Sequence, residues 1–469
     1  MKKFIKAFLF LLGVITILLL IYVLISFPPI MRGMAAKTMC SCVYVMGRSP
    51  ESVIQKELQV FPGLADVNLK FNDEDSTVTA KMLFQTSTAI YRKGLGCTLL
   101  AEADEKAVRQ QRFNTIPDRR TEQDTIPWPA GNLHAYTTAM NIDRAEIDNI
   151  VHETFVEHDA EKRKNTHAVV VVYRGKIVSE EYADGFDPES VLMGWSMTKS
   201  ITNALIGILV KEGRLSLHAP APIAEWQEDA RRQITLNHLL QASSGLEWSE
   251  SYFLPGADFH NMFILSDDKA GYAMRRGLRH GPGEFFEYSS GTTNILSKII
   301  RETVGDETYH RFPYEKLFLK IGMNRALIEP DASGTFVASS YGYASARDWA
   351  RLGLLYLNDG VWNGERILPE GWVQYSTTPA PAAKLREYGA QMWLNLGEEA
   401  HPGNVKYPGL PGEAVLFEGF ERNFVVLVPT KQLIVVRLGV THGGNFNIAD
   451  LVTRIMDGLP DADENLAGK

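Results

Sequence analysis

The most apolar stretch of the chain lies near its start. Residues 7–27 are apolar apart from two hydroxyl side chains and Tyr22, and lysines at positions 2, 3 and 6 precede them. A helix of this length rises about 31 Å at 1.5 Å per residue, which is enough to cross the hydrocarbon core of a bilayer. No second run of comparable length follows. The pattern therefore predicts one N-terminal transmembrane helix, within residues 1–30.

A cleavable signal peptide is the competing interpretation of this run. Its apolar region would be shorter, about 7–15 residues, and would end at a site of small residues. Here the run ends at Phe27-Pro28-Pro29, which favours an uncleaved signal anchor. The basic start places the N-terminus in the cytoplasm, although Arg32 and Lys37 beyond the run weaken this bias. We expect a single-pass protein whose body is extracytoplasmic, on the periplasmic side of the membrane.

Beyond the anchor, the pattern predicts strands near both ends of the chain and helices between them. Residues 77–84 alternate with a period of two, and residues 168–173 form a continuous apolar run typical of a buried strand. Residues 196–212 carry apolar side chains at helical spacing. Two apolar runs around a turn predict a hairpin over residues 422–438. This order indicates an α/β (α+β) fold with a largely antiparallel central sheet flanked by helices.

The chain is expected to have three regions. The anchor occupies residues 1–30, and a small extension with a charged connection occupies residues 31–132. A cluster of proline, glycine and asparagine at residues 126–132 favours a boundary there. The largest region, residues 133–469, carries the predicted central sheet and the candidate chemistry.

Charge and composition limit the partners and cofactors. The chain has 469 residues and a formal net charge of −8, yet its first 37 residues carry five basic side chains and no acidic one. An acidic body lacks the concentrated basic face that phosphate binding requires, so we expect no nucleic-acid partner. Its histidines and cysteines lack the spacing of known zinc sites, so no metal and no other cofactor is expected. Oligomeric state is not readable from the sequence.

Three cysteines fit an oxidising compartment. Cys40 and Cys42 follow the anchor, and Cys97 lies in the glycine-rich stretch 94–97. A Cys40–Cys97 bridge would tie the segment after the anchor to the next unit. The alternative, three buried free thiols, stays open.

The sharpest chemical signal is a serine and a lysine one helical turn apart. Ser196 and Lys199 lie at the predicted start of the helix over residues 196–212, so their side chains share one face. A serine hydroxyl becomes a good nucleophile when a base takes its proton, and a lysine can be that base when burial favours its neutral form. Free N–H groups at the helix start can stabilise an oxyanion. Trp195, beside Ser196, is the best pocket-lining candidate among Trp195, Trp248 and Trp393.

A second candidate segment lies about 90 residues further on. Tyr288 follows a Gly-Pro-Gly turn at residues 281–283 and precedes a polar stretch. A tyrosine close to a cationic lysine can act as a second proton carrier. Taken alone, both segments also have ordinary structural interpretations, a capping serine and a packed tyrosine.

Together these segments resemble the serine β-lactamase and penicillin-binding-protein superfamily, and within it the class C, esterase and nylon-oligomer-hydrolase branch. The Ser-x-x-Lys motif matches Ser196 and Lys199, and the Tyr-x-Asn/Ser motif matches Tyr288 and Ser290. Residues 239–246 resemble the family segment that lies between these motifs. The matching stretch runs from about residue 135 to about residue 450. It implies a β-lactamase/transpeptidase-like fold that includes an all-helical subdomain.

The third family motif, Lys-Thr-Gly or its equivalent, is missing from this chain. By order, the corresponding stretch is residues 417–423, and the resemblance implies an oxyanion contact from a strand edge there, at Gly419, Phe420 or Glu421. A backbone N–H can serve in this role because it needs no particular side chain. The cation that would grip a β-lactam carboxylate is absent, and Ser290 stands where class C enzymes carry asparagine. Both departures argue against efficient β-lactam hydrolysis.

The resemblance implies acyl transfer on a small ester, amide or peptide. Ser196 would attack the carbonyl, with Lys199 and Tyr288 as general base and acid, and water would release the acyl group. Ser290, Gly419, Phe420, Glu421 and Trp195 would contact the substrate or its oxyanion. The alternative is a membrane-tethered receptor, related to penicillin-binding proteins, that binds without turnover.

Overall fold

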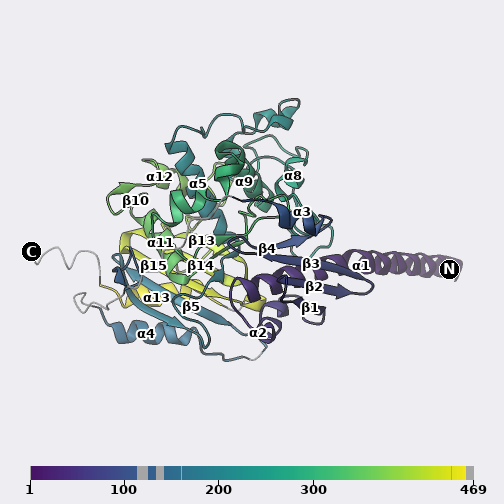
Figure 1. Cartoon of the computed structure of the whole chain (residues 1–469), viewed down its shortest axis with the longest axis horizontal. Helices are drawn as coiled ribbons and strands as arrows, with labels where there is room; N and C mark the ends of the chain where they lie inside the picture. The colour runs from purple at the N-terminus through teal and green to yellow at the C-terminus, as the bar shows by residue number, and fades with distance from the viewer. Residues whose placement is uncertain (1, 114–124, 134–141, 160, 445, 461–469) are drawn as a thin grey trace, which may run out of the picture. The chain divides into compact units, whose positions relative to one another are not determined.

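The computed structural model describes residues 2–113, 125–133, 142–159, 161–444 and 446–460. The chain divides into two compact units (Figure 1). Unit 1 comprises residues 1–110, 249–269 and 331–333, and unit 2 comprises residues 111–248, 270–330 and 334–469. Unit 1 therefore contains two segments that come from the middle of the chain.

Unit 1 is built on one long helix, α1 (Lys2–Tyr44). Its first part is long and apolar enough to cross a membrane, and the side chains of its most apolar window are exposed. The apolar run ends at Phe27, but the helix continues through Pro28 and Pro29. A proline inside a helix costs about 3 kcal/mol because it removes a hydrogen bond and crowds the preceding turn. Packing of the second half offsets this cost, since its buried side chains include Ile30, Met31, Ala35, Ala36 and Met39.

A four-stranded antiparallel sheet completes the core of unit 1. The strand predicted over residues 77–84 ends at Met82, because Leu83 has a φ of +56° and begins a turn. The elements of unit 1 are β1 (Asn68–Asn72), β2 (Thr77–Met82), β3 (Gln85–Arg92), β4 (Gly96–Leu100), α2 (Pro50–Gln55), α3 (Glu105–Gln110) and α7 (Asp258–Phe263).

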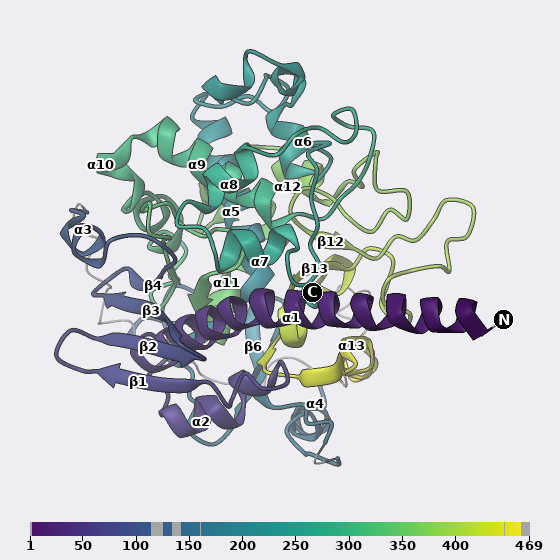
Figure 2. The ribbon, with the colours of Figure 1, turned by 90° about the vertical axis from the view of Figure 1, so that its right-hand side faces the viewer.

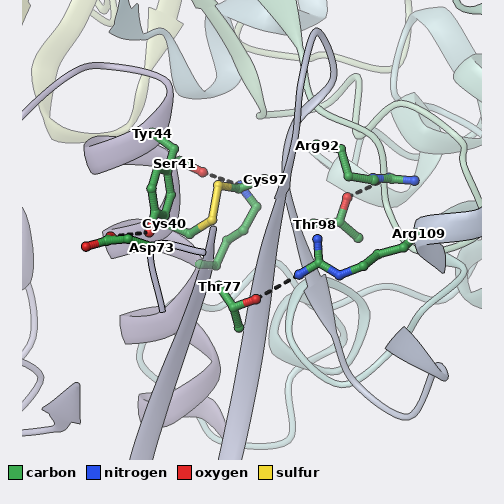
Figure 3. The surroundings of a disulfide bond; sticks show 10 residues. Cys40, Ser41, Tyr44, Asp73, Thr77, Arg92, Cys97, Thr98 and Arg109 are labelled. Carbon is green, nitrogen blue, oxygen red and sulfur yellow. Dashed lines mark hydrogen bonds between the residues drawn. A yellow bond between two sulfur atoms is a disulfide. The ribbon is translucent and has the colours of Figure 1, made fainter. Parts of the chain in front are cut away.

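A disulfide joins α1 to β4 of this sheet (Figure 3). Cys40 and Cys97 are bonded, with Cα atoms 6.0 Å apart, and Cys42 is buried and takes no part in this disulfide. The bonded pair is the one that the sequence favours. Tyr44, one turn after Cys40, stacks on Tyr91 with ring centroids 5.5 Å apart. The second half of α1 is thus held to the sheet by a covalent bond and by side-chain packing.

Unit 2 is organised around a six-stranded antiparallel sheet with the order β12-β13-β14-β15-β5-β6. All eight residues of β5 are buried, as expected for its continuous apolar run. The predicted C-terminal hairpin is formed by β14 and β15. The strands are β5 (Thr166–Tyr173), β6 (Lys176–Tyr182), β12 (Trp393–Leu394), β13 (Val415–Gly419), β14 (Asn423–Val428) and β15 (Leu433–Gly439).

Helices cover both faces of this sheet. Val171, Val426 and Val435 of one face pack in a core with Ile150 and Leu451, which belong to α4 (Arg144–Glu153) and α13 (Ile448–Asp457). On the other face, α11 (Ala346–Leu357) approaches closely at Gly353, where an added Cβ would lie 3.2 Å from the Ile434 side chain. This layered arrangement confirms the predicted antiparallel sheet flanked by helices.

The remaining elements of unit 2 position the candidate site. Central among them is α5 (Thr198–Lys211), which is buried from Thr198 to Leu209, and a single 3₁₀ turn precedes it. The helix predicted over residues 196–212 is therefore confirmed with a tighter first turn. The other elements are β7 (Leu192–Met193), β8 (Leu327–Ile328), β9 (Gly342–Ala344), β10 (Val361–Trp362), β11 (Glu365–Arg366), α6 (Leu236–Leu240), α8 (Lys269–Met274), α9 (Ser290–Val304), α10 (Asp306–Tyr309) and α12 (Trp372–Thr377).

Removing the disulfide is expected to destabilise unit 1. The bond closes a loop with a sequence separation of 57 residues, and closing a loop of that size stabilises the folded state by roughly 4 kcal/mol. The free energy of unfolding of a Cys40→Ala/Cys97→Ala double variant should be lower by about that much. It can be measured on the detergent-solubilised protein as the urea concentration at which the sheet of unit 1 becomes open to a protease. Cys42→Ala is the matched control, because it removes a buried sulfur from the same helix without opening the loop. A double variant no less stable than this control would contradict the expectation.

Candidate active site

A short strand and a tight turn present Ser196. The turn follows β7 and starts at Gly194, whose N–H donates to the carbonyl of Gly342 at 2.8 Å. Gly194 also lies against Trp349, since an added Cβ would be 2.2 Å from that ring. Trp195 has a φ of +50°, which is the left-handed region of backbone conformation. This conformation is uncommon for a bulky residue, and residues that adopt it cluster at functional sites. The backbone before the candidate nucleophile is therefore tightly determined.

Ser196 and Lys199 lie within hydrogen-bonding distance. The Nζ of Lys199 donates to the Oγ of Ser196 at 3.1 Å. It also donates to the Oγ of Ser290 at 3.1 Å and to the carbonyl oxygen of Ser339 at 3.0 Å. Lys199 is 2 % exposed, whereas Ser196 is half-buried. A deeply buried amine is thus held by three neutral oxygens, and one of them belongs to the candidate nucleophile.

The partners of Lys199 are Ser290, in α9, and the carbonyl of Ser339, in a segment that lies between β8 and β9. Ser290 is the first residue of α9, which is capped by the side chain of Ser289. The amide N–H of Ser339 donates to Asn294, on the next turn of α9, at 3.2 Å. The carbonyl of the preceding residue accepts a hydrogen bond from Thr202 of α5 at 2.9 Å. Side chains of α5 and α9 therefore fix the segment whose carbonyl contacts the lysine.

Tyr288 lies beside Lys199, as the sequence predicts, with its aromatic ring facing the lysine Nζ. The Nζ of Lys199 is 4.8 Å from the centroid of this ring, a cation–π distance. Trp393 stacks on Tyr288 with centroids 5.1 Å apart. The Nζ of Lys406 lies over the indole ring of Trp393, 3.0 Å from its centroid. The rings of Tyr288 and Trp393 thus lie between the Nζ atoms of the two lysines.

Lys406 is a cation near the site, but its ammonium is already paired. It donates to the carboxylate of Glu418, in β13, at 2.6 Å. Burial lowers the pKa of Lys406, while the Glu418 carboxylate opposes that shift. This ion pair leaves Lys406 poorly suited to grip a second carboxylate, which agrees with the missing Lys-Thr-Gly cation.

The end of β13 lies directly against the turn that presents Ser196. An added Cβ on Gly419 would be 2.2 Å from the carbonyl oxygen of Gly194. The ring of Phe420 packs edge-on against Trp195, with centroids 5.5 Å apart. Gly419 and Phe420, which the sequence assigns to the third-motif stretch, are therefore brought beside the candidate nucleophile.

The expected strand edge at residues 419–422 is wrong in one respect. Strand β13 ends at Gly419, and Phe420–Arg422 form a turn in which Glu421 and Arg422 have φ values of +60° and +63°. The side chain of Glu421 is 5 % exposed, and its carboxylate lies 3.4 Å from the Nδ1 of His442. The chain turns here because β14 must return antiparallel to β13, so backbone N–H groups of a turn take the place of those of a strand edge.

Arg437 of β15 stabilises this turn from within. It is fully buried, and its guanidinium donates to the carbonyls of Glu421 and Arg422 at 3.3 and 3.0 Å. Burial lowers the pKa of Arg437 to about 9, and the Glu421 carboxylate opposes the shift. Sequence analysis missed this role because an arginine within an apolar strand gives no sign of where its side chain points.

The structure brings together most of the site residues predicted from sequence. Contacts connect Ser196, Lys199, Tyr288 and Ser290. Beside them, Phe420 packs on Trp195, and Gly419 lies against Gly194. The hydroxyl of Ser290, which is predicted to contact the substrate, contacts Lys199 in the structure. The Ser339 carbonyl and Lys406 were missed. A backbone carbonyl leaves no trace in residue type, and Lys406 lies in a loop without a motif.

Comparisons with known proteins agree with this geometry. The profile of the beta-lactamase family matches residues 151–455, more than half of the chain. The chain belongs to the beta-lactamase family. The 6-aminohexanoate-dimer hydrolase of Paenarthrobacter ureafaciens is 26 % identical over 278 residues, which cover 53 % of this chain and 68 % of that protein.

Solved structures share the fold. A Bacillus anthracis protein provisionally named 6-aminohexanoate-dimer hydrolase superposes with a TM-score of 0.56 at 22 % identity, covering 74 % of this chain and 93 % of that one. A Bacteroides dorei protein provisionally named a beta-lactamase gives 0.54 at 18 % identity, with coverages of 67 % and 98 %. The predicted β-lactamase/transpeptidase-like fold is confirmed, and the chain is a β-lactamase-related serine hydrolase.

A methyl group on Gly419 is expected to impair this hydrolase. It would push β13 away from the Gly194 carbonyl, and a shift of about 1 Å in a catalytic site can cost about 100-fold in rate. Gly419→Ala should therefore lower kcat/KM for a p-nitrophenyl ester by about that factor. Gly412→Ala is the control, because its added Cβ would lie 3.9 Å from the nearest atom. Equal activities of the two variants would contradict the close approach.

Proposed function

We propose that this protein hydrolyses an ester or amide bond of a small molecule through an acyl-enzyme on Ser196. The observation that carries the proposal is the 3.1 Å contact between the Oγ of Ser196 and the Nζ of a lysine that is 2 % exposed. A serine needs a base to become nucleophilic. Burial of a lysine disfavours its charged form, and the neutral amine is the form that can take the serine proton.

In the acylation step, Lys199 starts as the neutral amine and accepts the hydrogen bond of the Ser196 hydroxyl. The Oγ of Ser196 then bonds to the substrate carbonyl carbon while its proton moves to the Nζ of Lys199. The carbonyl oxygen becomes an oxyanion, which the N–H of Ser196 and a backbone N–H of the Gly419–Arg422 turn would stabilise. The assignment of these two N–H groups is supported by the close approach of Gly419 to Gly194, which brings the two turns together. When the tetrahedral intermediate collapses, the leaving group takes a proton. Water, deprotonated in the same way, then releases the acyl group and restores the Ser196 hydroxyl.

Two hydroxyl groups are candidates for the proton that the leaving group needs. Tyr288, the predicted general acid, has its ring beside Lys199, and Ser290 shares a hydrogen bond with the same ammonium. We assign the transfer to Tyr288, with Ser290 positioning Lys199. A tyrosine close to a lysine can pass on the proton that the lysine has just received.

Aromatic side chains near Ser196 favour an acyl group that is apolar next to its carbonyl. Trp195 and Phe420 lie on one side of the nucleophile turn, and Tyr288 stacks with Trp393 beside the lysine. The relative named 6-aminohexanoate-dimer hydrolase carries the name of a linear amide, and a linear amide of short apolar segments suits these surroundings. Efficient β-lactam hydrolysis is not expected, since the ammonium of Lys406 is paired with Glu418.

We further infer that α1 anchors the protein in a membrane with both units outside the cytoplasm. The support is the length and apolar character of α1, the basic residues before it and the Cys40–Cys97 disulfide, which is typical of an oxidising compartment.

The assignment of the nucleophile predicts which variant loses covalent labelling. Wild-type protein should react with a fluorescent fluorophosphonate, and Ser196→Ala should not. Ser200→Ala is the matched control, because this serine is buried one turn further along α5 and its hydroxyl contacts the carbonyl of Gln391. Wild type and Ser200→Ala should turn over p-nitrophenyl butyrate repeatedly. Equal labelling of Ser196→Ala would contradict the nucleophile, and a single burst without turnover would favour the receptor alternative.

Tyr288→Phe tests the proton carrier. The variant keeps the ring that stacks on Trp393 but loses the hydroxyl, so kcat for an amide should fall about 100- to 10,000-fold. A p-nitrophenyl ester should be affected much less, because nitrophenolate leaves without protonation. The comparison within one variant separates proton transfer from a general loss of structure. Equal losses on both substrates would contradict the role of the hydroxyl.

A further inference from the structure

Unit 1 exposes large apolar side chains at the two tips of its surface that lie closest to the exposed part of α1. One tip is the β2–β3 turn, where Leu83 and Phe84 are 59 % and 98 % exposed. The other is the loop of residues 251–256, where Phe253 and Leu254 are 75 % and 57 % exposed. Exposure of such large apolar side chains to water is unfavourable. The position of both pairs near the exposed part of α1 therefore suggests a shared apolar environment.

The β2–β3 tip reaches the level of α1 at which that helix stops being buried. Strand β3 runs beside α1 in the same direction, because Arg32 donates to Ser87 at 3.0 Å and Tyr44 stacks on Tyr91. Phe84 precedes Ser87 by three residues, which is about 10 Å of strand and about seven residues of helix. This places the tip near residue 25 of α1. Figure 2 agrees, since the arrow of β2 points toward the end of the unit from which α1 extends.

The second tip reaches further along the exposed part of α1. The hydroxyl of Tyr22 donates to the carbonyl of Pro255. The backbone of Gly256 is equally close, because an added Cβ would lie 3.0 Å from the same hydroxyl. Phe253 meets Phe61 edge-on with centroids 5.7 Å apart, so the loop contacts unit 1 while most of the Phe253 side chain stays exposed.

Both tips therefore lie beside residues of α1 that are apolar and exposed. Val23, Leu24, Ile25 and Phe27 of this stretch are 40, 62, 68 and 38 % exposed, and burial in unit 1 begins with Pro28. Residues 7–27 match the thickness of a bilayer core, and Tyr22 lies five residues, about 8 Å, inside its outer end. A bilayer that surrounds this stretch would meet both tips where aromatic and apolar side chains favour the interface.

We propose that unit 1 is seated on the membrane by these two tips, which insert Leu83, Phe84, Phe253 and Leu254 into the leaflet from which α1 emerges. The proposal rests on the inferred anchoring by α1. The occupant is the lipid surface itself, because both tips continue the apolar surface of the anchor. Unit 1 would then have three points of contact with the bilayer in place of one flexible tether.

Spin labels on the full-length protein in phosphatidylcholine vesicles can test the insertion. A nitroxide is attached to one new cysteine at a time in Phe84→Cys, Phe253→Cys, Leu18→Cys and Lys93→Cys, and the unsubstituted protein gives the background of the buried Cys42. Leu18 reports on the anchor. Lys93 is exposed just after the opposite end of β3 and is the control for water exposure. The readout is the ratio of collisional accessibility to oxygen, which concentrates in lipid, over that to a water-soluble nickel chelate.

The expected ratios are above one at Leu18, Phe84 and Phe253, and below one at Lys93. Ratios below one at both Phe84 and Phe253, with Leu18 still above one, would overturn the seating while leaving the anchor intact. A ratio below one at Leu18 would overturn the anchor and the seating together. Because both phenylalanines are largely exposed, their replacement leaves the core of unit 1 unchanged, and loss of folding does not confuse the result.

Discussion

One contact, between a buried lysine amine and a serine hydroxyl, sets the requirements for much of unit 2. Lys199 can lie 3.1 Å from Ser196 because Ser196 stands in the 3₁₀ turn that leads into α5 and Lys199 in the first turn of α5. It stays out of water because α5 is buried from Thr198 to Leu209. A buried amine must have its hydrogen bonds satisfied. Ser290 of α9 and the carbonyl of Ser339 provide them, so two further segments are placed around the same nitrogen atom.

The oxyanion side of the site depends on a different constraint, the close approach of two backbones. Gly419 lies so close to the Gly194 carbonyl that no side chain fits between them, and the turn that follows relies on Arg437. An arginine removed from water is costly unless its N–H groups find acceptors. Carbonyls of Glu421, Arg422 and Lys164 accept its hydrogen bonds. Polar groups buried behind the site thus keep its backbone in place.

Local patterns predicted those parts of the structure that depend on local sequence. The apolar run of β5, the spacing in α5 and the ordered motifs around Ser196 and Tyr288 gave the sheet, the central helix and the paired side chains. Contacts between distant segments were beyond reach. Periodicity does not show that α1 continues past Pro28, because packing of residues 30–39 decides that. The φ of Glu421 likewise follows from how the β13–β14 connection closes. The Lys406–Glu418 pair follows from how the loop between β12 and β13 folds back onto β13.

The role of Lys199 as the base toward Ser196 is tested most directly by the rate of the first acylation. Stopped-flow release of nitrophenolate would compare wild type with Lys199→Met, which keeps much of the side-chain volume but has no amine. With a melting curve to show that the variant is folded, acylation should slow by about 100- to 10,000-fold, the usual contribution of a general base. A folded Lys199→Met protein that acylates Ser196 at the wild-type rate would contradict the mechanism.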